Sequence, residues 1–424
     1  MSMLIFLIML PGFILLIPTV VLFIEVVLAL PRKAENSHFA SPRSMRVGII
    51  VPAHNEGAGL LPTLHDLQSQ ITVGDRIVVV ADNCSDDTAA ISAMAGVEVV
   101  VRNDGTRLGK GYALSAGMQH LSSDPPDLVL FCDADCRLQP NVIELLAMEC
   151  ERSHRPVQAC YLMKRAPDAA TDQAFAEFAW KLKNLVRPLG LRNLRGPCQL
   201  MGTGMMFPWD VIRAAPLASG NLVEDLQLGL DLALKGSAPL FVPSAVTTSV
   251  FPSSENGAET QRKRWVEGHL ATITGQVPRL LAGAGKRGDL NLLVLALDLA
   301  VPPIVLLAAL LIGAWCIAAA AVLVALPVSA LLPATTGVAL LGTSLVAAWA
   351  RFGNDRLLVL NPLKMTTVVA AKSRVYMQLA QGKKSGCWVR TERDDVKSSA
   401  LLLAPELGCK DNIEANNVGL SKIR

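Results

Sequence analysis

Long apolar stretches near both ends of the chain predict membrane-spanning helices. Residues 4–24 carry no charged side chain over about the 20 residues that a helix needs to cross hydrocarbon. A secretory signal peptide is the alternative, but no basic segment precedes the run and no small-residue cleavage pattern follows it. We therefore expect an uncleaved transmembrane helix within residues 1–30.

A second apolar tract covers residues 290–350 and is long enough for two crossings, with a turn between residues 327 and 333. Its first part, 290–300, predicts a helix along the membrane surface, with Asp298 at the interface, before Pro302 and Pro303 turn the chain inward. Residues 290–352 should thus hold one interfacial helix and two transmembrane helices.

Basic residues flank these crossings on one side. They follow the first crossing, precede the second and follow the third, at Arg32, Lys33, Arg43, Arg46, Lys286, Arg287, Arg351 and Arg356. By the positive-inside rule we expect a multi-pass protein of a bacterial-type inner (plasma) membrane, with the large middle segment in the cytoplasm. Residues 353–424 should form a cytosolic amphipathic segment and tail.

The middle segment alternates short β-rich runs with helical stretches. This pattern predicts an α/β domain at residues 45–285, built on a doubly wound, mostly parallel sheet. The predicted strands are 47–51, 76–81, 97–102 and 128–131, and the predicted helices are 60–70, 86–95 and 109–121. The amphipathic stretch 168–187 has two interpretations, core packing or a helix resting on lipid.

Acidic residues follow each of the four predicted strands. Asp133 and Asp135 come directly after the fourth, and two carboxylates there can converge on one divalent cation whose other ligands are phosphate oxygens. An acidic pair in isolation is more typical of a strand end or a helix cap. Four coincident strand ends favour a ligand site, since open α/β sheets bind ligands where strands end.

Composition narrows the class of protein. A hydrophobic content of 51% and a mean hydropathy of +0.40 suit a membrane-bound enzyme. Nine cysteines without paired spacing fit a reducing compartment, and we interpret Cys132 and Cys136 as buried thiols rather than zinc ligands. A net charge of +3 without a basic stripe gives no support for nucleic-acid binding.

Further residues suit transfer of a group from a nucleotide diphosphate. Lys110, expected in a flexible turn at 109–111, can reach the diphosphate, and Asp225, at the start of a helix with Glu224, can act as a base. Helix capping is the alternative for this acidic pair. Gln261, Arg264 and Trp265 fall on one helix face, where a guanidinium suits phosphate and an indole suits a sugar ring; an exposed basic helix is the alternative.

In this order, Asp82, Asp133-Ala134-Asp135, Glu224-Asp225 and Gln261 to Trp265 resemble the motifs of membrane-bound glycosyltransferases of family 2, over about residues 46–270. The resemblance implies a GT-A fold, an inverting reaction, a nucleotide-diphosphate sugar as donor and Mg²⁺ or Mn²⁺ as cofactor. Asn83, Cys84 and Val223 depart from the usual pattern without removing a proposed catalytic group.

The resemblance also implies a role for each site residue. Asp225 would be the catalytic base, and Asp133 and Asp135 the metal ligands. The nucleotide sugar would be bound by Pro52, Ala53, Asn55, Glu56, Asp82, Lys110, Asp133, Ala134, Asp135, Gln261 and Arg264. The acceptor would be bound by Gly202, Thr203, Gly204, Glu224 and Trp265. A weaker likeness, Trp-x-x-Thr-x-Arg at 388–393, would cover the nucleotide.

We therefore expect a transferase that adds a sugar, from UDP-sugar by preference, to a lipid-linked saccharide or glycolipid in exopolysaccharide or cell-envelope biosynthesis. A processive polysaccharide synthase is an alternative, distinguished by the length of its product. An inactive membrane scaffold is another, and it is opposed by the presence of every proposed catalytic group. The donor sugar, the acceptor and the oligomeric state stay open.

Overall fold

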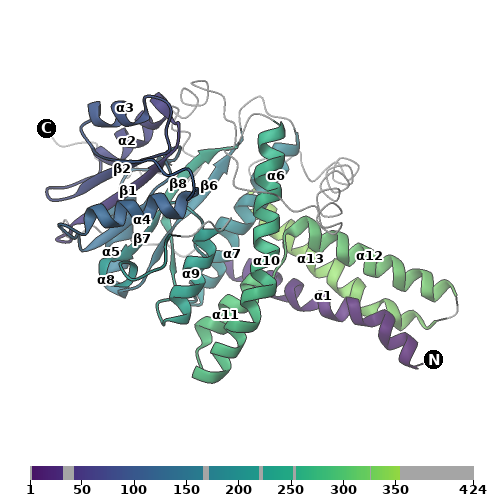
Figure 1. The fold of residues 1–424 in the computed structure, drawn as a ribbon. Helices are drawn as coiled ribbons and strands as arrows, with labels where there is room; N and C mark the ends of the chain where they lie inside the picture. The colour runs from purple at the N-terminus through teal and green to yellow at the C-terminus, as the bar shows by residue number, and fades with distance from the viewer. Residues whose placement is uncertain are drawn as a thin grey trace, which may run out of the picture.

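Figure 1 shows an α/β domain from which a group of long helices projects. The computed structural model describes residues 2–31, 43–165, 171–218, 223–251, 255–324 and 326–353. The expected tail, with its Trp-x-x-Thr-x-Arg segment at 388–393, lies outside these residues.

In the part of the chain that the structure describes, one sheet of eight strands organises the domain, in the order β3-β2-β1-β4-β7-β6-β8-β5. Its first half is parallel and contains the four strands predicted from sequence, each within a residue or two of its expected bounds. These are β1 (Val47–Ala53), β2 (Arg76–Asp82), β3 (Glu98–Arg102) and β4 (Leu128–Phe131). The runs of β1, β2 and β4 are apolar because helices cover both faces of the sheet.

The second half of the sheet is mixed. β7 (Met205–Pro208) runs antiparallel to both β4 and β6 (Val157–Lys164), and β6 pairs in parallel with β8 (Leu240–Val250). The short β5 (Arg137–Leu138) is antiparallel to β8. The α/β class is confirmed, but the three longer strands of this half were not predicted.

Helices pack on the two faces of the sheet over separate apolar cores. One core lies beneath η1 (Gly57–Leu60), α2 (Leu61–Gln68) and α5 (Val142–Ser153) and contains Leu64 and Leu146. The other lies beneath α4 (Lys110–Leu121), α8 (Trp209–Ile212) and α9 (Glu224–Leu234) and contains Leu114 and Leu228. α3 (Thr88–Met94) lies between β2 and β3 in the chain.

Within the described residues, three helices are long and apolar enough to cross a membrane, as predicted. They lie in α1 (Ser2–Ala29), in α12 (Ile304–Leu323), and in η3 (Val328–Leu331) with α13 (Leu332–Phe352). All three extend together from the same side of the α/β domain (Figure 1).

A helical segment connects these helices to the domain. It consists of α6 (Thr171–Lys181), the π-helix η2 (Leu182–Val186) and α7 (Arg187–Asn193). Leu182 and Val186 pack with Leu22 of α1 and Leu341 of α13 in one buried cluster. Of the two interpretations of this stretch, the structure thus supports packing.

α10 (Glu255–Arg287) runs to α11 (Leu290–Leu299), the helix expected on the membrane surface. Asp298 was expected at the interface, but its side chain is buried inside the protein. It accepts hydrogen bonds from Arg187 (2.5 Å) and Gln199 (2.7 Å), and Arg187 also donates to Glu25 of α1 (2.7 Å). A polar cluster therefore fastens α1, α7 and α11 together.

Candidate active site

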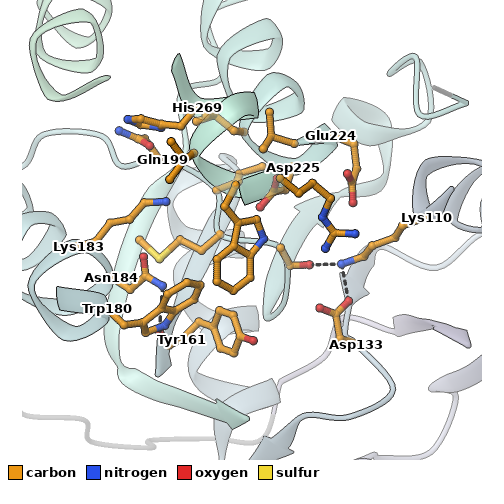
Figure 2. Close-up of a pocket in the computed structure, with 18 of the residues that line it drawn as sticks. Lys110, Asp133, Tyr161, Trp180, Lys183, Asn184, Gln199, Glu224, Asp225 and His269 are labelled. Atoms are coloured by element: carbon orange, nitrogen blue, oxygen red, sulfur yellow. Dashed lines mark hydrogen bonds and ion pairs between the residues drawn. The ribbon is translucent and has the colours of Figure 1, made fainter. Parts of the chain in front are cut away.

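A cavity of about 500 Å³ lies where β1, β2 and β4 end. Asp82 at the end of β2 lines it. So do Lys110 at the start of α4, Asp133 after β4 and Asp225 at the start of α9 (Figure 2). Residues far apart in the sequence thus meet in one space. Parallel strands bring their carboxyl ends to the same edge of a sheet, which explains the convergence.

The end of the cavity near β1 and β2 is formed by Pro52, Ala53, Glu56 and Asp82. The Asp82 carboxylate accepts a hydrogen bond of 2.5 Å from Arg102. This arginine was not singled out from sequence, since it belongs to the neighbouring strand β3.

Asn55, expected to bind the nucleotide sugar, does not line the cavity. Its Oδ1 accepts a hydrogen bond from the backbone N–H of Ser85 (2.7 Å), and its backbone lies in the left-handed region with φ of 53°. Asparagine tolerates that conformation better than most residues. Asn55 therefore shapes the loop, and its neighbour His54 lines the cavity instead, with Nδ1 2.7 Å from the Asp82 carbonyl oxygen.

Asp133 and Asp135 suit a divalent cation. One carboxylate oxygen from each lies within 4.8 Å of the other and of the Cys136 sulfur. Burial raises the pKa of Cys136 well above its ordinary value and that of Cys132 to about 12, so both remain protonated thiols. The available donors are thus carboxylate oxygens, which Mg²⁺ and Mn²⁺ prefer.

Lys110 is the first residue of α4, so the flexible turn expected from the sequence is wrong at this position. Its ammonium forms an ion pair with Asp133 and donates a hydrogen bond to the Gly202 carbonyl (2.6 Å). Burial lowers the pKa of Lys110, but Asp133 and Glu224 outweigh it and hold this pKa above its ordinary value. A fixed cation at a helix N-terminus is a favourable place for phosphate.

Glu224 and Asp225 form the first turn of α9. Burial raises the pKa of Glu224 to about 7, and the adjacent charge of Asp225 adds to the effect. Burial likewise raises the pKa of Asp225, while Lys110 and the N–H of Leu226 oppose it. A buried carboxylate with a raised pKa is a better proton acceptor than an ordinary aspartate.

The expected acceptor turn, Gly202-Thr203-Gly204, divides into two parts. Gly202 lines the cavity with φ of +95°, and a Cβ there would lie 3.3 Å from the Asp225 carboxylate. Thr203 is fully buried, and its hydroxyl accepts a hydrogen bond from the Asp133 N–H (3.0 Å). A Cβ at Gly204 would meet Ala159 at 2.7 Å, so this glycine serves sheet packing.

Arg264 and Trp265 of α10 also line the cavity, and Gln261 lies one turn earlier on the same helix. The Trp265 ring packs on Trp180 with centroids 4.8 Å apart, and Trp180 makes an edge contact with Tyr161 at 5.5 Å. These three rings form an aromatic wall.

Several lining residues were missed by the sequence analysis. Tyr161, Trp180, Lys183, Asn184, Gln199 and His269 surround the part of the cavity nearer the membrane helices (Figure 2). The mixture of aromatic and basic residues in 168–187 was a signal for two of them, Trp180 and Lys183, although it gave no direction for their side chains.

A mixed sheet with acids at its strand ends, a helix-borne lysine and a buried acidic helix start defines a GT-A type glycosyltransferase domain. The family model "Glycosyltransferase like family 2" matches residues 42–268 of the 424, more than half of the chain. The protein belongs to this family of nucleotide-sugar glycosyltransferases.

No curated protein matches the chain. Among solved structures, it is similar to the mannosyltransferase PcManGT from Pyrobaculum calidifontis in complex with GDP-Man and Mn²⁺, with 16% identity and a TM-score of 0.49, over 82% of this chain and 99% of the other. Glucosyl-3-phosphoglycerate synthase from Mycobacterium tuberculosis has 21% identity and a TM-score of 0.37, over 53% of this chain and 80% of the other. TarS from S. aureus has 15% identity and a TM-score of 0.37, over 55% of this chain and 40% of the other.

Proposed function

We propose that this protein is an inverting glycosyltransferase that moves a sugar from a nucleotide-diphosphate sugar to a lipid-linked saccharide or glycolipid. Its catalytic domain faces the cytoplasm of a bacterial-type inner membrane, and its product serves exopolysaccharide or cell-envelope biosynthesis. One observation carries the proposal: Asp133, Lys110 and Asp225 line a cavity that continues to the start of the membrane helix α12.

The donor would lie along the strand ends. Its nucleoside would contact Pro52, Ala53 and Asp82, and its diphosphate would lie beside Lys110 and Arg264. Mg²⁺ or Mn²⁺ held by Asp133 and Asp135 would neutralise charge on the diphosphate as it leaves. Lys110 adds a fixed positive charge there, because α4 holds it at its N-terminus.

Asp225 would act as the base. It takes the proton of the acceptor hydroxyl, whose oxygen attacks the anomeric carbon while the bond to the diphosphate breaks. We propose that the base and the leaving group stand on different sides of the sugar, with Asp225 on one side and the Lys110–Asp133 pair on the other. Attack opposite the leaving group inverts the anomeric carbon.

The acceptor would enter from the membrane side. Leu22 of α1 and Val301 to Val305 line the cavity there, and this apolar wall suits the hydrocarbon of a lipid. Gly202 would let the acceptor sugar approach Asp225, and Trp265 would pack against its ring.

A donor screen tests the proposal. Purified full-length protein in detergent would be incubated with several nucleotide sugars and Mn²⁺ or Mg²⁺, and released nucleoside diphosphate would be measured with and without lipid extract. We expect one donor to be used, with release stimulated by the extract and stopped by chelator.

The Asp225→Asn variant should lose about 10²- to 10⁴-fold in turnover, as expected for a missing general base, while still binding nucleotide. Asp210→Asn, at an exposed site on α8, is the matched control and should keep full turnover. Turnover retained by Asp225→Asn would contradict the assignment of the base and favour a scaffold.

A further inference from the structure

The membrane end of the cavity has an apolar wall with one cation projecting from it. The wall is formed by Leu22, Val301, Pro302, Pro303, Ile304 and Val305, which belong to two membrane helices or immediately precede one. Lys183 reaches into the same space from the side opposite Lys110 and Asp133 (Figure 2). An ammonium group beside an apolar surface loses part of its hydration, which is unfavourable unless the group is paired with a polar or anionic partner.

Lys183 has no such partner among the residues that the structure describes. Two other cations that line the cavity already form ion pairs: Lys110 is paired with Asp133, and Arg187 with Glu25 and Asp298. Arg264 also lines the cavity, and the proposed function assigns it to the donor diphosphate. Among the lysines and arginines of the described chain that line the cavity, Lys183 is therefore the one with neither an acidic partner nor a role in the proposed mechanism.

The groups around Lys183 do not neutralise its charge. Burial lowers the pKa of His269 to about 3, so this imidazole is neutral, and the Asn184 amide donates to the Tyr161 carbonyl (3.3 Å). Two acids act on Lys183 from a distance: Asp298, which already accepts from Arg187 and Gln199, and Asp225, the proposed base. Neither carboxylate forms an ion pair with Lys183 in the described part of the chain.

The backbone that carries Lys183 is unusual. Residues Leu182–Val186 form a π-helix, a conformation that occurs mainly as single turns at functional sites. Leu182 and Val186 on this turn pack against α1, while Lys183 remains exposed to the cavity. The same π-turn thus carries two side chains that pack against α1, Leu182 and Val186, and one that a ligand in the cavity can contact, Lys183.

We propose that Lys183 binds the phosphate of a lipid phosphate acceptor. The hydrocarbon of this lipid would follow the wall from Val301 to Leu22, and its saccharide would extend toward Asp225. The inference rests on the proposed function and deepens it by naming the chemical class of the acceptor. A neutral glycolipid would leave the Lys183 ammonium unpaired, and free phosphate has no hydrocarbon that could contact the apolar wall.

Binding measurements in the absence of any nucleotide sugar test the inference. Full-length protein in uncharged detergent micelles would be titrated calorimetrically with a long-chain prenyl monophosphate, the corresponding prenyl alcohol and inorganic phosphate. We expect the wild type to bind the monophosphate at least about tenfold more tightly than the alcohol, as a charged hydrogen bond provides. Inorganic phosphate should neither bind measurably nor displace the monophosphate.

Three variants sharpen the measurement. Lys183→Met should bind both lipids with the affinity that the wild type has for the alcohol, and Lys183→Arg should keep the preference for phosphate. Lys235→Met, at an exposed lysine after α9, is the matched control and should behave as the wild type. Unchanged affinity of Lys183→Met for the alcohol shows that the apolar wall is intact.

Equal affinity of the wild type for monophosphate and alcohol would overturn the inference, as would a preference retained by Lys183→Met. Tight binding of inorganic phosphate that depends on Lys183 would also overturn it, in favour of a soluble anion. Because these titrations need no turnover, a failure of every nucleotide sugar in the donor screen would refute the proposed function separately.

Discussion

Two clusters of carboxylates around a cation differ sharply in their surroundings. Lys110 and Asp133 are 20% and 28% exposed and face a cavity, whereas Arg187, Glu25 and Asp298 are 8%, 2% and 6% exposed and lie between helices. The open pair can exchange its partners for a cation and a diphosphate, while the charges of the closed cluster are already paired with one another. Similar residues thus serve a site in one place and attachment of the membrane helix in the other.

Removing a carboxylate from the open site should have the largest effect on catalysis. We expect Asp133→Asn or Asp135→Asn to lower turnover by about 10²- to 10³-fold, because charge on the leaving diphosphate is then poorly neutralised. Thermal unfolding should change little, since both side chains face the cavity. A steady-state assay and a melting curve, with Asp210→Asn as control, check this; a large loss of stability would erase the contrast between the clusters.

Removing the cation from the closed cluster should instead cost stability. Arg187→Met leaves Glu25 and Asp298 buried without their counter-charge, which should destabilise the fold by about 3–5 kcal/mol. Replacing all three residues with apolar ones of similar size should restore most of this free energy. Denaturant unfolding in detergent measures both, and a triple variant as unstable as Arg187→Met would show that more than pairing is involved.

A methyl group at Gly190 tests how closely the membrane helix is attached. A Cβ there would lie 2.0 Å from the Glu25 carbonyl oxygen, so Gly190→Ala must separate α7 from α1 and should cost about 1–3 kcal/mol. Gly275→Ala on α10, where a Cβ would meet nothing within 4 Å, is the control and should be neutral or slightly stabilising. Equal unfolding free energies of the two variants would contradict the close approach.

Acidification should affect the open site gradually. The base must be a carboxylate. Burial raises the pKa of Asp225 and, to about 7, that of its neighbour Glu224, so the pair takes up protons at higher pH than ordinary carboxylates do. Turnover should therefore fall on the acid side by up to about tenfold per pH unit. Glu224→Gln should shift this limb to lower pH, because a neighbouring negative charge is gone. A pH profile at saturating donor that stays flat through neutrality would oppose this assignment.

The parts of the fold that were predicted depend on local signals. Strands β1 to β4 are short apolar runs ending in polar residues. Asp133 was identified because it comes after such a run, and Asp225 because it lies at the start of a helix. In contrast, β6 and β8 hold polar residues such as Gln158 and Thr247 at fully buried positions. Hydrogen bonds with two distant residues, Thr203 and Met201, stabilise Gln158 there, and such bonds leave no local pattern in the sequence.

The candidate site shows the same limit. Its acids were identified by type and position, but the direction of each side chain depends on tertiary contacts. Thr203 supports the Asp133 backbone instead of facing a ligand, and Lys183 lines the cavity from a π-helical turn that the sequence did not indicate. Asp298 has its partner, Arg187, more than a hundred residues away, so no window of sequence could have revealed the pair.

Gly202 sets the width of the passage between the proposed base and the lysine. A Cβ there would stand 3.3 Å from the Asp225 carboxylate and 4.0 Å from the Lys110 ammonium, and the backbone conformation itself disfavours any larger residue. Substitution of Gly202 by a larger residue is therefore not a way to change which acceptors fit. Under the proposed function, we expect the acceptor range to depend on the aromatic side of the cavity, where the Trp180 and Trp265 side chains can be shortened by substitution.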